Sequence, residues 1–330
     1  MPTLTSAHDL ITAIPFLLGF HPSESIVLIA VKEDAIGLAM RIDLPDRLES
    51  EAIDQLASHF LREEADAALV VAYLPAGRSD GDQLLIALGA GFIRNGIAIQ
   101  ESILVQHERY KSIICRDSTC CPPAGKDVPD ISKSEIAVQH VVAGVPMPFA
   151  NIAELVDSIS ADPISLSKEW SQQVALHIID EDAPDIDLLR RDGVESMDLL
   201  LDEYRLGHGA RNQGLIARMI GRMSDVQVRD YALGVHSEDT FDLYFVMWRE
   251  LLRLAPVGSV APIACIVAAM AYEHGDGAVA QKALDRAFAD DELYPLAGLL
   301  RRVFNAGWPP TSFAQMRAEL HPKVVATIFG

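Results

Sequence analysis

The first part of the chain alternates between segments with helical spacing and short apolar runs. Residues 6–18 open on a pattern that resembles a capping box, which predicts a helix that Gly19 ends. The run 25–32 is β-branched and apolar at consecutive positions, so it predicts a central strand buried on both faces. A second strand is expected over 36–44, and the short link at 33–34 predicts a hairpin.

The same alternation continues as far as the first cysteines. Helical spacing over 46–64 and 81–95 predicts two helices. A buried strand is expected over 68–74 and a final pair of strands over 97–106 and 109–115. The order is strand, strand, helix, strand, helix, strand, strand. It predicts an N-terminal α/β sandwich whose mixed sheet is parallel where helices intervene and antiparallel at hairpins.

The second part of the chain has helical spacing almost throughout. Aromatic and leucine residues over 241–252 follow steps of four and three, which place them on one helical face. We therefore expect an α/β domain over 1–130 and a helical domain over 131–330. Small residues and a Gly-Asp turn within 261–294 give the helical domain a tetratricopeptide-like unit, although a compact bundle fits the pattern equally well.

The overall charge narrows the class of partner. Lysine and arginine total 27 against 47 aspartates and glutamates, a formal net charge of −20. Nucleic-acid binding requires a basic face, and no cluster of basic residues supplies one, so neither nucleic acid nor an anionic membrane is expected as partner. A cationic or neutral small ligand or protein partner fits better. The sequence specifies no cofactor.

Targeting signals are not evident either. The first residues lack the basic and apolar regions of a signal peptide, and the most apolar segment, 257–272, contains a proline and indicates a buried helix. A cytoplasmic location is therefore expected, and cysteines there usually stay reduced.

Three of the four cysteines, Cys115, Cys120 and Cys121, lie within seven residues. Zinc prefers about four thiolate or imidazole ligands, so these thiols with His107 or His140 are weak metal candidates, because adjacent ligands suit one ion poorly. A reversible Cys115–Cys120 disulfide and a nucleophilic thiol are the alternatives. The simplest hypothesis is that the thiols pack a loop shaped by the prolines and glycine that follow.

Two further segments carry polar side chains beside predicted strands. The loop 19–25 combines histidine, serines and a carboxylate, but it lacks the Gly-x-Ser-x-Gly elbow of a serine hydrolase. The segment 107–112 forms either a solvated edge or the wall of a pocket beside the cysteines. Joining both to the cysteine loop gives one candidate ligand pocket. Its residues are His21, Ser23, Ser25, Arg109, Tyr110, Ser112, Cys115, Cys120 and Cys121.

Two motifs resemble a known family. The segments 15–25 and 120–125 match the patterns PxLLGFHPxxS and CCPxxG, and 228–230 and 275–277 extend the likeness toward the C-terminus. Together they resemble an actinobacterial family catalogued as a domain of unknown function. The resemblance implies a soluble bacterial protein of two parts and no particular reaction or catalytic residue.

Three hypotheses about function follow. The first is a non-catalytic protein that binds a ligand or partner, with the helical domain mediating assembly. The second is a hydrolase or transferase with a cysteine or serine nucleophile near the loops 19–25 and 115–125. The third is a structural zinc or redox site at the cysteines.

Overall fold

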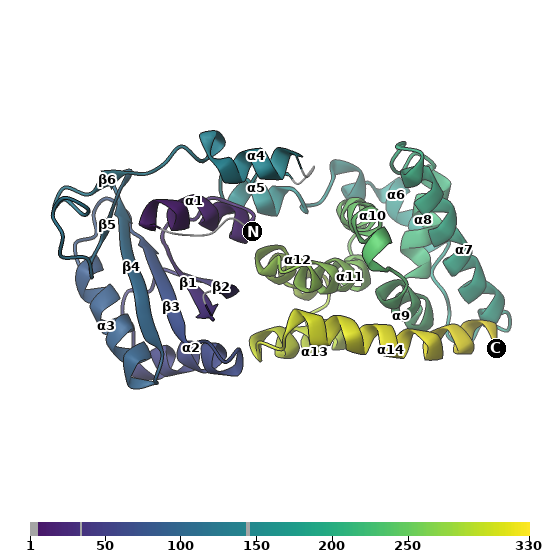
Figure 1. Ribbon diagram of the computed structural model, residues 1–330. Helices are drawn as coiled ribbons and strands as arrows, with labels where there is room; N and C mark the ends of the chain where they lie inside the picture. The colour runs from purple at the N-terminus through teal and green to yellow at the C-terminus, as the bar shows by residue number, and fades with distance from the viewer. Residues whose placement is uncertain (1–5, 34, 143–145) are drawn as a thin grey trace. The chain divides into compact units, whose positions relative to one another are not determined.

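The chain divides into two compact units, Met1–Leu155 and Val156–Gly330. The computed structural model describes residues 6–33, 35–142 and 146–330. Figure 1 shows a sheet in the first unit and helices in the second, which confirms the predicted combination of an α/β part and an all-α part. Helices α4 (Glu135–Val142) and α5 (Ile152–Asp157) begin within the first unit, so this unit extends beyond the predicted 1–130 domain.

The described residues of the first unit form a mixed sheet in the order β2-β1-β3-β4-β5-β6. Its strands are β1 (Ser25–Lys32), β2 (Ala35–Asp43), β3 (Ala67–Tyr73), β4 (Ala98–Gln106), β5 (Arg109–Ser112) and β6 (Lys126–Asp127). Only β3 and β4 are parallel neighbours; every other adjacent pair is antiparallel. The predicted hairpin of β1 and β2 is confirmed, and Asp34 of its link lies outside the described residues.

The order of the strands explains why two helices share one face. Since β1 is antiparallel to both β2 and β3, these two run parallel, and α2 (Ser50–Arg62) is the crossover between them. Helix α3 (Gly81–Arg94) then crosses from β3 to β4 in the same direction along the sheet. Crossovers of this kind are right-handed almost without exception, so both helices must cover the same face.

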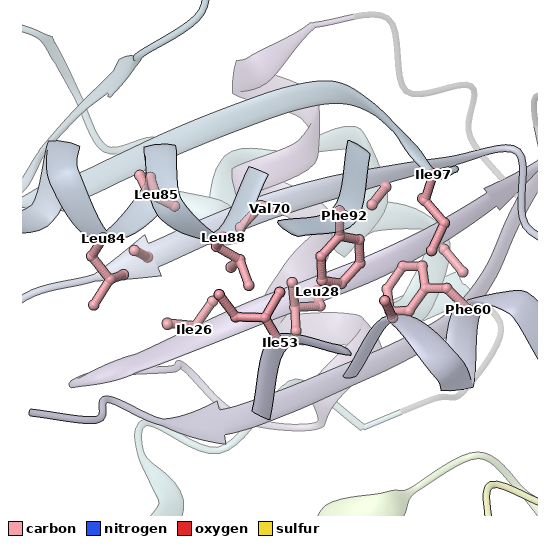
Figure 2. Packing of buried hydrophobic residues seen from close by; sticks show 14 of the residues in the cluster. Ile26, Leu28, Ile53, Phe60, Val70, Leu84, Leu85, Leu88, Phe92 and Ile97 are labelled. Atoms are coloured by element: carbon pink, nitrogen blue, oxygen red, sulfur yellow. The ribbon is translucent and has the colours of Figure 1, made fainter. Parts of the chain in front are cut away.

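This face holds a continuous apolar core. Ile26 and Leu28 of β1 and Val70 of β3 lie beneath the two helices, as Figure 2 shows. Phe60 of α2 and Phe92 of α3 meet edge to face, with ring centroids 5.0 Å apart. Each such buried side chain contributes roughly 2 kcal/mol, so the core stabilises the helix layer together with the central strands.

Helix α1 (Ala7–Leu18) lies on the other side of the sheet from α3 (Figure 1). The Ser6 hydroxyl accepts a hydrogen bond from the Asp9 amide and caps the helix, and Gly19 ends it with a φ of 76°. Leu10 and Ile14 are buried on its inner side. The N-terminal segment therefore covers the face that the two crossovers leave open.

The second unit is built from packed helices. The longer ones are α6 (Lys168–Ala175), α7 (Ile186–Arg205), α8 (Gln213–Arg222), α9 (Val226–Gly234), α10 (Phe241–Leu254), α11 (Val260–Glu273), α12 (Gly277–Asp290), α13 (Pro295–Asn305) and α14 (Pro310–Phe329). Helix α11 is buried nearly all round, as a central helix must be. Helices α11 and α12 form an adjacent pair where the 261–294 unit was predicted. None of the described helices is long and apolar enough to cross a membrane.

A buried ion pair between Arg317 and Glu273 holds α14 against the other helices of this unit. Arg317 of α14 donates to the Glu273 carboxylate at 2.6 Å and to the carbonyl of Gly234 at 2.8 Å. His236 lies 3.2 Å from the other oxygen of the same carboxylate. Since the three side chains are largely buried, removing Arg317 or Glu273 would leave the charge of the other uncompensated in the interior.

Candidate functional site

The loop 19–25 ends at the sheet edge where β3 and β4 finish. The amide of His21 donates to the Phe149 carbonyl at 2.9 Å, and the Phe149 amide donates back to the carbonyl of Gly19 at 2.8 Å. Ser25 then enters β1 opposite Tyr73, the last residue of β3. In open α/β sheets, ligands bind beyond the carboxyl ends of the parallel strands. The loop is therefore anchored at the edge where a ligand is expected.

A cavity of about 420 Å³ opens at this edge, which we call the carboxyl-edge pocket. Its lining residues come from α1, the loop 19–25, the ends of β3 and β4 and the segment after β6. They are Ile11, Pro15, His21, Pro22, Ser23, Glu24, Tyr73, Leu74, Pro75, Val105, Gln106, His107, Glu108, Val128, Pro129 and Ile131. The volume falls within the range of ordinary small-molecule sites, and most of the lining is apolar.

The polar groups of the pocket are uncharged or acidic. Burial lowers the pKa of the His21 imidazole and raises the pKa of the Tyr73 phenol, so both are neutral at pH 7. The Glu24 and Glu108 carboxylates are exposed at the rim and form no hydrogen bond or ion pair with another described residue. No lysine or arginine is among the lining residues, so the pocket has no counter-charge for these carboxylates.

The rim is held in an unusual backbone conformation. Glu24 has a φ of 43°, and His107 and Glu108, the two-residue link between β4 and β5, have φ values of 53° and 57°. A two-residue hairpin with positive φ at both positions is the type I′ turn, which strongly favours Asn-Gly. A side chain in this region costs about 1–2 kcal/mol. His107 and Glu108 therefore occupy two positions at which glycine would make the turn more stable.

The three clustered cysteines lie elsewhere. Their Sγ atoms are all within 4.8 Å of one another, and the three thiols are free. Cys120 and Cys121 border a second depression, the cysteine depression, which has a volume of about 340 Å³. It is lined by Ser6, Ala7, His8, Tyr110, Lys111, Cys120, Cys121 and Lys126. The two sets of lining residues have no member in common.

The residues that the sequence suggested as one pocket are therefore not brought together. His21 and Ser23 line the carboxyl-edge pocket, whereas Tyr110 borders the cysteine depression. The reason is the direction of β5, which runs back antiparallel to β4 and places Ser112 opposite Ile103. The cysteine loop therefore starts well away from the carboxyl edge.

Arg109 and Ser112 hold the structure of the cysteine loop. The Arg109 guanidinium donates to the carbonyls of Ala124 and Gly125, both at 2.7 Å, and pairs with Asp127 at 2.6 Å. The buried Ser112 hydroxyl donates to Glu101 at 2.7 Å and accepts from the amide of Cys115 at 3.1 Å. Both side chains are engaged within the protein, which is typical of a structural role.

Among the proposed nucleophiles, Cys121 and Ser25 lie in surroundings that do not activate them. Burial, with a smaller contribution from hydrogen bonds to the other two thiols, raises the pKa of Cys121 to about 11, which disfavours its thiolate at pH 7. The buried hydroxyl of Ser25 has no hydrogen-bond partner among the described residues, so no base contacts it. The geometry around these two groups is not that of an activated nucleophile.

Tyr73 and Glu108 were missed by sequence reasoning. Tyr73 was treated as part of a buried strand, and Glu108 as part of the link before the next one. The available signal was their position, since each lies at the carboxyl end of a strand flanking the predicted parallel crossover.

The profile of the family described as "Domain of unknown function (DUF4192)" matches residues 8–311, which is most of both units. The chain belongs to this family. The match includes the carboxyl-edge pocket and the clustered cysteines of this DUF4192 member. No curated protein and no solved structure matches the chain significantly.

Proposed function

We propose that the first unit binds a small organic cation, a protonated amine on an apolar body, in the carboxyl-edge pocket. The observation that carries the proposal is the pair of rim carboxylates, Glu24 and Glu108, which have no partner among the described residues. They border a mostly apolar cavity whose lining includes no lysine or arginine. Each carboxylate is held on left-handed backbone, where glycine would avoid the steric cost. This form of the ligand-binding hypothesis is non-catalytic.

The apolar and the acidic lining residues would contribute to binding in different ways. The apolar body would pack against Ile11 and Val105, and this burial supplies most of the affinity. The amine would lie between the rim carboxylates, where each exposed ion pair contributes up to about 1 kcal/mol. The neutral imidazole of His21 offers an additional hydrogen-bond acceptor. The resulting preference is for cationic over anionic ligands, as the net charge of the chain also favours.

Scaffolding by the helical unit, the other part of the hypothesis, is supported only by the presence of packed helix pairs such as α11 and α12. It stays a prediction.

The test compares three probes of similar size and different charge on the full chain: 2-phenylethylamine, 2-phenylethanol and 3-phenylpropanoate. Saturation-transfer NMR with titration should rank the amine first. Glu24→Gln and Glu108→Gln should each weaken amine binding about fivefold, because each removes roughly 1 kcal/mol of ion pairing.

The matched control is Glu33→Gln. Glu33 is also an exposed glutamate with left-handed backbone, at a φ of 49°, but it does not line the pocket. Its substitution should leave the amine affinity unchanged. Equal binding of the three probes, absence of binding up to millimolar concentration, or an equal effect of the control would show that the proposal is wrong.

A further inference from the structure

The clustered cysteines carry an inference independent of the ligand pocket. We propose that Cys115, Cys120 and Cys121, with His8 of α1 as the fourth ligand, form a tetrahedral Zn²⁺ site. The Sγ atoms of the three cysteines lie within 4.8 Å of one another. A Zn–S bond of about 2.3 Å in a tetrahedral site separates neighbouring sulfurs by about 3.8 Å. Bringing the three sulfurs onto one ion therefore requires a shift of about 1 Å at most. His8 lies outside the group that meets the 4.8 Å limit, so its ring has to move further to complete the site.

The loop around the thiols is organised from several sides. The amide of Cys121 donates to the Asp117 carbonyl at 2.7 Å, and the Asp117 carboxylate accepts from the Thr119 amide at 2.8 Å. The amide of Cys115 donates to the Ser112 hydroxyl at 3.1 Å, which fixes the start of the loop. Hydrogen bonds of this kind hold the loop in place and so orient the ligands that it carries. Adjacent cysteines, which the sequence made unfavourable as joint ligands, are brought to one point by this turn.

His8 is the imidazole placed to complete the set. It lies in the first turn of α1 and lines the cysteine depression together with Cys120 and Cys121. Its exposed ring forms no hydrogen bond with another described residue. The two histidines suggested by sequence are engaged elsewhere: His107 borders the carboxyl-edge pocket, and the His140 ring packs against Phe16 at 4.5 Å.

The charge balance of the site is favourable. Binding replaces three thiol protons, which leave to solvent, by three Zn–S bonds and adds one Zn–N bond to neutral His8. The product has one net negative charge. Lys126 lines the same depression and offsets that charge, whereas Lys111, which also lines it, is paired with Asp82 at 2.9 Å. Three soft thiolates with one imidazole select zinc over the hard cations Mg²⁺ and Ca²⁺.

The first measurement uses the unmodified full chain, produced in zinc-supplemented medium and purified without chelator. Elemental analysis should find about one zinc per chain. Replacing zinc by Co²⁺ should give intense thiolate-to-cobalt absorption and the visible bands of tetrahedral cobalt. A zinc content near zero combined with no such spectrum after Co²⁺ addition overturns the proposal, as does a disulfide among the three cysteines in protein purified without reductant.

The second measurement assigns the ligands. Cys115→Ser, Cys120→Ser and Cys121→Ser should each reduce the charge-transfer absorption by one thiolate's share and weaken Co²⁺ binding at least tenfold. His8→Ala should keep the thiolate absorption, weaken binding about tenfold and change the visible bands. The matched control is Cys265→Ala, which removes a buried thiol of the second unit and should change neither spectrum nor stoichiometry.

If a variant fails to fold, the Co²⁺ spectrum of the unmodified chain decides the test. If His8→Ala leaves both the affinity and the visible bands as they were, the fourth ligand is not His8. If Cys265→Ala abolishes the absorption, the cluster is not the site.

Discussion

Five described residues other than glycine have left-handed backbone, and three of them, Glu24, His107 and Glu108, border the carboxyl-edge pocket. Strain of this kind tends to concentrate at functional sites, where the side chain matters more than local stability. At the residue scale, the rim therefore has side chains at positions where its turns favour glycine. The cost of such a side chain can be measured as a change in the free energy of unfolding.

Replacing Glu108 by glycine should stabilise the protein by about 1 kcal/mol, because glycine adopts a φ of 57° without steric cost. Urea unfolding of the full chain measures the change. Glu63→Gly is the control, since Glu63 has a φ of −79° and should lose about 0.5–1 kcal/mol through chain entropy alone. A loss of stability in Glu108→Gly would contradict the strain argument.

At the scale of elements, the close packing of α2 and α3 depends on a missing side chain. A Cβ atom at Gly91 of α3 would lie 2.3 Å from a methyl carbon of Ile53 in α2, whereas at Gly89 the nearest atom would be 3.6 Å away. The two helices share one face because both crossovers run in the same direction, and this glycine sets how near they approach.

Gly91→Ala should destabilise the protein by about 1–3 kcal/mol, because the added methyl group overpacks the contact with Ile53. Gly89→Ala, in the same helix, should stabilise it by up to about 1 kcal/mol through helix propensity. Thermal unfolding of both variants gives the comparison. Similar effects in the two would mean that the contact does not limit the helix spacing.

The elements themselves were largely predictable from sequence. Consecutive apolar residues identified β1 and β3, and Gly19 marked the end of α1. The helix expected over 46–64 begins later than predicted: α2 starts at Ser50 after the N-cap Glu49, and the Asp46 carbonyl accepts a hydrogen bond from Arg78. Helix boundaries depend on such distant contacts, which periodicity does not encode.

The candidate site was less predictable, because it depends on the order of the strands. Local spacing does not reveal that β1 pairs with both β2 and β3, nor that β5 carries Ser112 away from the loop 19–25. His21 and Ser23 were found by their residue types alone. The Glu24 carboxylate was also noted in that loop, but Glu108, and its place on the same rim, needed the strand ends to be placed first.

At the scale of the whole molecule, half-buried histidines link stability to pH in both units. Burial lowers the pKa of His59 in the first unit and, with nearby positive charge, that of His321 in the second. The unfolded chain takes up protons on these rings near pH 6.5, whereas the folded chain does so only at lower pH. The contribution of these neutral imidazoles to the free energy of unfolding is present above pH 6.5. It is lost as the pH falls through the lowered pKa values of the folded chain.

His59→Gln and His321→Gln should therefore each reduce the stability lost between pH 7.5 and pH 5.5, measured by urea unfolding. The raised pKa values of Asp198 and Asp276 act in the opposite direction, so each variant is compared with the unmodified chain. Between pH 7.5 and pH 8.5 the imidazoles are neutral in both states, and the variants should show no difference in slope. An unchanged loss on acidification would exclude these rings as its cause.

Helix α1 has one property that reaches beyond packing. Ile11 and Pro15 line the carboxyl-edge pocket, and Ser6, Ala7 and His8 line the cysteine depression, so one rigid helix borders both. An occupant that holds the helix at one end restricts its motion at the other. By thermodynamic reciprocity, an ion at the thiols would change affinity in the pocket by the same factor as the pocket's ligand changes affinity for the ion. Two sites with no common residue would then respond as a cooperative pair.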